Sequence, residues 1–355
     1  MAIKELFQDA RPRILFDPRA SQRVDPRFQF TRNGVASYYD SQGILRSALA
    51  NQPRAGTYEP DANGVMQLIG LQIEKAKTNY IEQSVDLTDS SWDNYKFLTP
   101  TLNAGTAPDG TNTATSLVPN TENIDRTLKR NNIATTFQGT LTVSVFAKAS
   151  GYNKFKLFID GATGGGSFGG SATFDLSSET ITNGSTGVGA ISKLPNDWYR
   201  CSVTHTNTTK AFTVSPSIQG LDNSGNTVWA GNGTSGYLFW GFQLEENSFA
   251  SSYISTSGSA VTRPADLLTV ETPLPSTGSI YIDARLLDSD VDATLLSAAP
   301  ASPSTDKLTL AIRQPASLYN SKALVYEVDG EFSPTLPFPV PSIARERNLI
   351  TYGAN

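Results

Sequence analysis

The residues of this chain best suited to chemistry are aromatic and amide side chains in predicted loops, which could bind a sugar. Flat aromatic rings stack on the apolar faces of pyranose rings, while amides and carboxylates bind the sugar hydroxyl groups. The alternative for each aromatic residue is that it only anchors its loop. The residues expected to contact a glycan are Trp92, Tyr95, Tyr152, Trp229, Tyr237, Asp222 and Asn223.

Catalytic groups are scarce. His205 is the only histidine, and Cys201 the only cysteine. Four positions apart in one strand, the two lie about 13 Å from each other, whereas a nucleophile must touch its imidazole base. Glu245 and Glu246 are adjacent, so a strand points them to opposite faces and they cannot flank one glycosidic bond. We expect no catalytic residue and no enzyme, although a site shared between subunits remains an alternative.

The sequence contains no complete motif for a metal ion or a cofactor. Zinc needs a cluster of cysteine and histidine, which one residue of each type cannot supply. Calcium takes oxygen ligands, but the carboxylate runs of this chain lack the glycine and closing glutamate of an EF-hand and are typical of turns and caps. These runs are Asp288-Ser-Asp290-Val-Asp292 and Asp86, Asp89 and Asp93. The glycines at 164–166 lack the Lys-Ser/Thr of a phosphate loop. We therefore assign no metal ligand and no cofactor.

Charge and hydropathy limit the partners. The formal net charge is -5 and only 17% of the residues are charged, whereas phosphate binding needs concentrated lysine and arginine. We therefore expect no nucleic acid. No stretch approaches the roughly 18 apolar residues of a membrane span, and the first residues lack the apolar core of a signal peptide. The sequence predicts no membrane insertion and folding in the cytoplasm of the cell that makes it.

A period-two pattern of apolar residues predicts strands between residues 81 and 266. Alternate positions are apolar in three runs, and the stretch GYLFWGFQLE is apolar on both faces, as in a central strand covered on both sides. Spacers rich in Gly, Asn, Asp and Ser separate the runs. The sequence therefore predicts an all-β fold, an antiparallel jelly-roll sandwich. The three runs are Leu141, Val143, Val145 and Ala147; Phe155, Leu157 and Ile159; and Tyr199, Cys201 and Val203.

The segments on either side of the sandwich have weaker patterns. Residues 1–80 hold short apolar pieces, with six arginines in the first 32 residues, which predicts an extended N-terminal arm that packs on its own sandwich or attaches to a neighbour. Residues 267–355 hold three strand-like runs and alternating prolines at 337, 339 and 341, which predict a small C-terminal β region with an extended strap. Small sheets with open edges favour association, and we expect a homo-oligomer, a trimer.

Several motifs resemble those of tailed-bacteriophage virion structural proteins that contain a jelly roll like a carbohydrate-binding module. The resemblance covers roughly residues 24–266. In those proteins the W-Y-R-x-S-V and W-G-x-Q-L-E strands close the sandwich, which implies core positions for Trp198 and Trp240. The motifs are D-P-R-x-x-F-T-R at 25–32, P-R at 53–54, G-L-x-I-E-x-x-x-T-N at 70–79, W-Y-R-x-S-V at 198–203, W-G-x-Q-L-E at 240–245, S-Y-I-x-T at 252–256 and V-T-R-x-A-D at 261–266.

The resemblance implies a function as well as a fold. It indicates a virion protein, a tail fibre or baseplate-associated fibre subunit that binds other virion proteins through its N-terminal arm and contacts host surface glycans. A head-decoration or head-fibre protein is an alternative within the same class. A hydrolase of capsule or cell-wall polysaccharide is an alternative from a different class.

Overall fold

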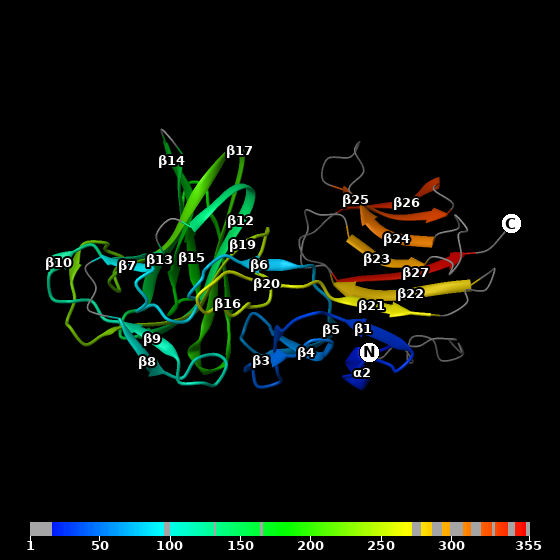
Figure 1. Cartoon of the computed structure of the whole chain (residues 1–355), viewed down its shortest axis with the longest axis horizontal. Helices are drawn as coiled ribbons and strands as arrows, with labels where there is room; N and C mark the ends of the chain where they lie inside the picture. Colours follow the sequence, from blue (N-terminus) through cyan, green and yellow to red (C-terminus); the bar gives the residue numbers. More distant parts are fainter. Residues whose placement is uncertain are drawn as a thin grey trace. The chain divides into compact units, whose positions relative to one another are not determined.

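The computed structural model describes residues 16–95, 100–130, 133–163 and 166–271, and six strands between residues 278 and 352. The described chain is almost entirely antiparallel β-structure, with one short helix, α2 (Pro18–Ser21), and one 3-10 turn at Pro195–Asp197 (Figure 1). The predicted all-β class is confirmed. None of the described helices has the length and apolar character needed to cross a membrane.

The chain forms two compact units, residues 1–271 and 272–355. The predicted division into three parts, at residues 80 and 266, stays a prediction. The main sheet of the first unit has 11 strands. These strands are β7 (Trp92–Tyr95), β8 (Thr101–Gly105), β9 (Ala114–Leu117), β11 (Thr127–Arg130), β12 (Ile133–Ser150), β13 (Lys154–Thr163), β14 (Gly166–Asp175), β15 (Thr180–Asn183), β16 (Val188–Lys193), β17 (Tyr199–Gly220) and β19 (Gly236–Glu246).

This sheet folds over itself into a sandwich of two six-strand layers, and the long strand β17 belongs to both. The first part of β17 pairs with β12 and β16, and its last part pairs with β13 and β11. One layer therefore has the order β16-β17-β12-β19-β9-β8, and the other has β15-β14-β13-β17-β11-β7. The rings of Phe155 on β13 and Phe239 on β19 meet between the layers, with centroids 5.2 Å apart.

The main core lies between the two layers. It contains all ten residues of the three alternating runs that the sequence predicts to be buried, so those strand faces are confirmed. Cys201 belongs to this core and is fully buried, which raises the pKa of its thiol well above the usual value. Apolar burial on this scale is the main favourable contribution to folding.

The strand β19 is covered on both faces, as its sequence predicts, but the faces are not those of a simple alternation. Phe239 and Phe242 lie in the main core, whereas Trp240 lies in a second core on the other side of the layer. A β-bulge at this point shifts the pairing with β12, and Gly241 takes a positive φ of 66°. An extra residue in one strand reverses which face the following side chains occupy.

The N-terminal segment and the residues after the sandwich run side by side. Strand β1 pairs with β21, β6 pairs with β20, and a small sheet has the order β3-β2-β4-β5. Leu45 from this segment packs with Phe146, Trp198 and Trp240 in the second core. The strands are β1 (Phe28–Thr31), β2 (Ala36–Tyr39), β3 (Leu45–Ala48), β4 (Arg54–Pro60), β5 (Met66–Gln72), β6 (Lys77–Asn79), β20 (Val261–Arg263) and β21 (Leu267–Val270); a further pair is β10 (Asn123–Ile124) with β18 (Trp229–Ala230).

In the second unit β22 pairs with β27, and a four-stranded sheet has the order β23-β24-β25-β26. Pro337 and Pro339 lie in β26 at the edge of this sheet, a position that tolerates proline because one side of the strand needs no donor. Pro341 and the aspartates at 288, 290 and 292 lie outside the described residues. The strands are β22 (Gly278–Arg285), β23 (Ala293–Ala298), β24 (Leu308–Arg313), β25 (Ser321–Val328), β26 (Glu331–Pro339) and β27 (Arg345–Tyr352).

Candidate functional site

Five of the seven residues predicted to contact a glycan come together at one end of the sandwich. The ring of Tyr152 meets the rings of Trp229, at 4.4 Å between centroids, and Tyr237, at 5.9 Å. Asn223 bonds the adjacent turn: its Nδ2 donates to the carbonyl of Gly151 at 3.1 Å, and its Oδ1 accepts from the Asn153 amide at 3.0 Å. Asp222 closes its own loop by accepting from the amides of Ser224 and Asn226.

Burial limits what this aromatic cluster can do. Trp229 and Tyr237 are buried, at 6% and 1% exposure, and only Tyr152 is half-buried. Burial also raises the pKa of Tyr237, whose hydroxyl donates to the carbonyl of Leu221. The guanidinium of Arg126 lies over the ring of Trp229, 4.8 Å from its centroid. The rings of Trp229 and Tyr237 are therefore used for packing in this structure, and their contact with a glycan stays a prediction.

Replacing Trp229 with alanine should lower the free energy of unfolding by about 2–3 kcal/mol, since it empties a buried site and removes the support of Arg126. Thermal unfolding followed by circular dichroism measures the change. Phenylalanine at the same position keeps a ring under Arg126 and should cost clearly less. Equal stability of the alanine variant and the unaltered protein would show that this tryptophan is not a packing residue.

The other two predicted residues lie elsewhere. Trp92 is buried in the main core, where its ring lies 4.7 Å from that of Phe242 and its Nε1 donates to the carbonyl of Gln83 at 3.1 Å. Trp92 is therefore a core residue in this structure, and its contact with a glycan stays a prediction. Tyr95 occupies the last position of β7 and pairs with Thr127 of β11. It belongs to a row of residues that crosses the outer face of the second layer.

This polar sheet face is formed by two rows of cross-strand partners, which share one side of the layer. Both rows consist mainly of hydroxyl, amide and lysine side chains, and the side chain of Ser217 at their centre is almost fully buried. Ser217 Oγ donates to Asp160 Oδ2 at 3.0 Å. The first row is Asp93, Lys129, Ser217, Phe158 and Ser171; the second is Tyr95, Thr127, Gln219, Lys156, Thr173 and Thr182.

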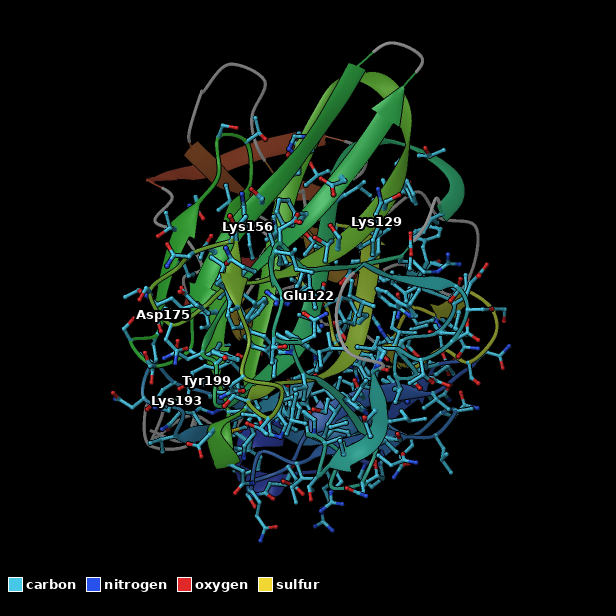
Figure 2. The ribbon with its side chains drawn as sticks, turned by 90° about the vertical axis from the view of Figure 1, so that its left-hand side faces the viewer. Glu122, Lys129, Lys156, Asp175, Lys193 and Tyr199 are labelled. Atoms are coloured by element: carbon cyan, nitrogen blue, oxygen red, sulfur yellow. The ribbon has the colours of Figure 1, made fainter. Side chains whose placement is uncertain are left out.

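Two lysines lie on either side of the central strand of this face. Lys129 comes from β11 and Lys156 from β13, and β17 runs between them. Figure 2 looks onto this side of the sandwich, where both lysines are labelled. The Lys156 ammonium also lies over the ring of Phe158, 4.6 Å from its centroid. The sequence alone does not reveal this face, because alternating polar residues are typical of any solvated strand and the register between strands cannot be read from them.

A second constellation is a buried ion cluster of five residues, Arg32, Arg54, Glu74, Arg263 and Asp266. Asp266 accepts from Arg32 Nη1 at 2.9 Å and from Arg54 Nη2, and Arg54 Nη1 donates to Glu74 Oε2 at 2.5 Å. Arg263 Nη1 lies 3.5 Å from Glu74 Oε2. The side chains are at most 5% exposed, so the cluster is shielded from solvent. It joins the N-terminal segment to the chain that leaves the sandwich.

Electrostatics within the cluster follow from burial and proximity. Burial would raise the pKa of Glu74, but Arg263 and Arg54 outweigh it, and the pKa of this carboxyl lies below its usual value. Burial lowers the pKa of Arg263, and no nitrogen of its guanidinium has a hydrogen-bond partner within the described chain. A buried charge that loses its partner is strongly destabilising. The cluster therefore depends on all its members being present.

The residues considered for catalysis are used for packing and turns. His205 is buried, with Nδ1 3.0 Å from the Thr186 carbonyl oxygen. Glu245 is fully buried and accepts from Ser251, whereas Glu246 is exposed, so the predicted separation of the two carboxylates is confirmed. Asp86 and Asp89 accept hydrogen bonds from residues two positions ahead. The described residues contain no group of three or more metal-ligating side chains.

Comparison with known proteins gives a distant likeness. No protein-family model matches the chain, and no curated protein matches it. Among solved structures, the chain is similar to the N-terminal endo-1,4-beta-D-xylanase 10B of Clostridium thermocellum. That structure contains the CBM22-1 and GH10 modules complexed with xylohexaose. The identity is 16% and the TM-score 0.26, over 47% of this chain and 27% of that chain. The chain thus spans about a quarter of the length of that protein.

Proposed function

We propose that the protein is a structural subunit of a tailed-bacteriophage particle, a tail fibre or baseplate-associated fibre, whose β-sandwich contacts glycans on the host surface. The observation that supports this proposal is the buried ion cluster. Its five members are charged residues of the motifs by which the chain resembles phage virion proteins, and they come from four separate stretches of sequence.

The five charged residues meet in one buried place although they belong to separate motifs. If the motifs matched by chance, these residues would be expected at scattered surface positions. Here Arg32 and Arg54 precede the sandwich and Arg263 and Asp266 follow it, yet all four meet in one buried place. The motifs are therefore best explained as the signature of one structural module. Because β1 pairs with β21 and β6 with β20, the polypeptide enters and leaves this module along neighbouring strands. Such a module can be inserted into a longer assembly and display its sandwich.

The proposal includes partners and location. The N-terminal arm binds other virion proteins, three copies associate, and the protein is part of the virion after synthesis in the bacterial cytoplasm. The glycan contact fits the polar sheet face, which offers hydroxyl, amide and ammonium groups side by side.

The location can be tested on purified phage particles. We expect mass spectrometry to detect the chain in particles purified by density gradient, and gold-labelled antibodies against the unit of residues 1–271 to bind at the tail or baseplate. Particles from a phage with the gene deleted are the control. Labelling of the head would contradict the fibre proposal in favour of a decoration protein. Absence of the chain from particles would contradict any virion role.

A further inference from the structure

The polar sheet face holds two lysines that stand out from the other lysines of the sandwich. Among strand lysines with described side chains, four have a polar partner. Neither Lys129 nor Lys156 has a hydrogen bond or ion pair within the described part of the chain. The four partnered lysines are Lys77 and Lys148, bonded to the carbonyls of Glu246 and Asn196, and Lys154 and Lys193, paired with Asp175 and Glu179.

Both lysines are neighbours of the buried Ser217 in the register of the sheet. Lys129 is the direct cross-strand partner of Ser217 on one side, and Lys156 is diagonal to it on the other. Two carboxylates share this face with the lysines: Asp160, which accepts from Ser217, and Asp93, the cross-strand partner of Lys129 on its other side. Neither lysine forms an ion pair with these carboxylates in the part of the chain that the structure describes, so both ammonium groups are open to an anionic partner from outside. An anionic partner that also accepts hydrogen bonds stabilises an ammonium group more than a neutral acceptor does.

The spacing of the lysines indicates the size of the partner. They are two strands apart, about 9–10 Å, and offset by two residues, about 7 Å, so their backbones are roughly 12 Å from each other. One small anion cannot bridge them, whereas successive units of a polymer can. Hydroxyl and amide groups next to them, on Thr127 and Gln219, suit the hydroxyls of a sugar.

We propose that the polar sheet face binds an acidic polysaccharide, with Lys129 and Lys156 each pairing with a carboxylate of a different sugar unit. This inference rests on the glycan contact of the proposed function and names its ligand class. The Phe158 ring, held beneath the Lys156 ammonium, is half-buried and supports the lysine that would meet the ligand. The buried aromatic cluster at the end of the sandwich takes no part in this site.

The test is a binding titration with defined polymers. Isothermal titration of the full chain with polygalacturonate and with hyaluronate, at low and high sodium chloride, is compared with dextran as a neutral reference. We expect binding to at least one acidic polymer that weakens with salt, and none to dextran. The double variant Lys129→Gln, Lys156→Gln should bind about tenfold or more weakly, because it removes two charge-assisted hydrogen bonds. Lys75→Gln, at an exposed lysine away from this face, is the matched control.

Three results would overturn the inference. They are an absence of binding to both acidic polymers, equal binding to dextran, and an unchanged affinity of the double variant. Because both lysines are on the surface side of their strands, the double variant should unfold at the same temperature as the unaltered protein, which excludes a folding defect. Failure of this test leaves the particle-labelling result unaffected, so the site and the virion role can be judged separately.

Discussion

Replacing Asp266 with asparagine should lower the free energy of unfolding by about 3–5 kcal/mol, because removing one charge of a buried ion pair leaves the other charge buried without compensation. Asp266 is the common acceptor for Arg32 and Arg54, and its Oδ2 also accepts from the backbone amide of Glu74 at 2.9 Å. Asparagine has the same shape but no charge, and it cannot accept at both positions. Urea unfolding followed by tryptophan fluorescence measures the loss.

The exposed pair of Arg27 and Asp25 provides the control for this variant. The two side chains are 2.8 Å apart, but Arg27 is half exposed. Exposed ion pairs contribute little to stability because water and salt screen them. Asp25→Asn should therefore leave the unfolding midpoint close to that of the unaltered protein. If Asp266→Asn had as small an effect as Asp25→Asn, the buried cluster would not be what joins the two ends of the module.

Replacing Trp240 with alanine should cost about 3–5 kcal/mol, which is enough to prevent soluble folding of many domains. Trp240 is 3% exposed, and its ring packs against those of Tyr253, at 4.7 Å between centroids, and Phe146, at 5.5 Å. Its Nε1 donates to Thr113 Oγ1 at 3.0 Å. The alanine variant loses the packing of the second core and leaves this hydroxyl without its donor. Soluble yield and thermal unfolding are the measurements.

Phenylalanine at position 240 separates the contribution of ring packing from that of the hydrogen bond to Thr113. It keeps an aromatic ring against Phe146 and Tyr253 but cannot donate to Thr113, so its cost should be intermediate. A soluble alanine variant with an unchanged unfolding temperature would show that the second core does not hold the N-terminal segment on the sandwich. In that case the contact of Leu45 with this core would be incidental.

Local alternation in the sequence was a reliable guide to the strands that carry the main core. It identified the inward faces of β12, β13 and the first part of β17. It could not identify the bulge beside Gly241, because the residue that interrupts an alternating pattern is recognisable only once the partner strand is aligned. For that reason Trp240 and Phe242, which a regular alternation would place on one face, pack in different cores.

The candidate site was predictable only in part. Tyr152, Trp229 and Tyr237 could be found as aromatic residues near turns, but the sequence could not show that two of them are buried. Lys129 and Lys156 carried no recognisable signal, since each looks like an ordinary residue on a solvated strand. They differ from other surface lysines because strand β17 brings them together on one face. Their neighbourhood depends on the pairing of Lys129 with Ser217, almost ninety positions away in the sequence.

By itself, the sequence determined the class of the fold, the inward faces of its strands and the absence of a histidine or cysteine cluster, because these depend on composition and on a period of two along one strand. The tertiary structure alone decided which residues meet. Arg32 and Asp266 are 234 positions apart, and their contact depends on strand order and register. The long-range pairing of the chain, which no local pattern encodes, therefore created both the buried ion cluster and the polar sheet face.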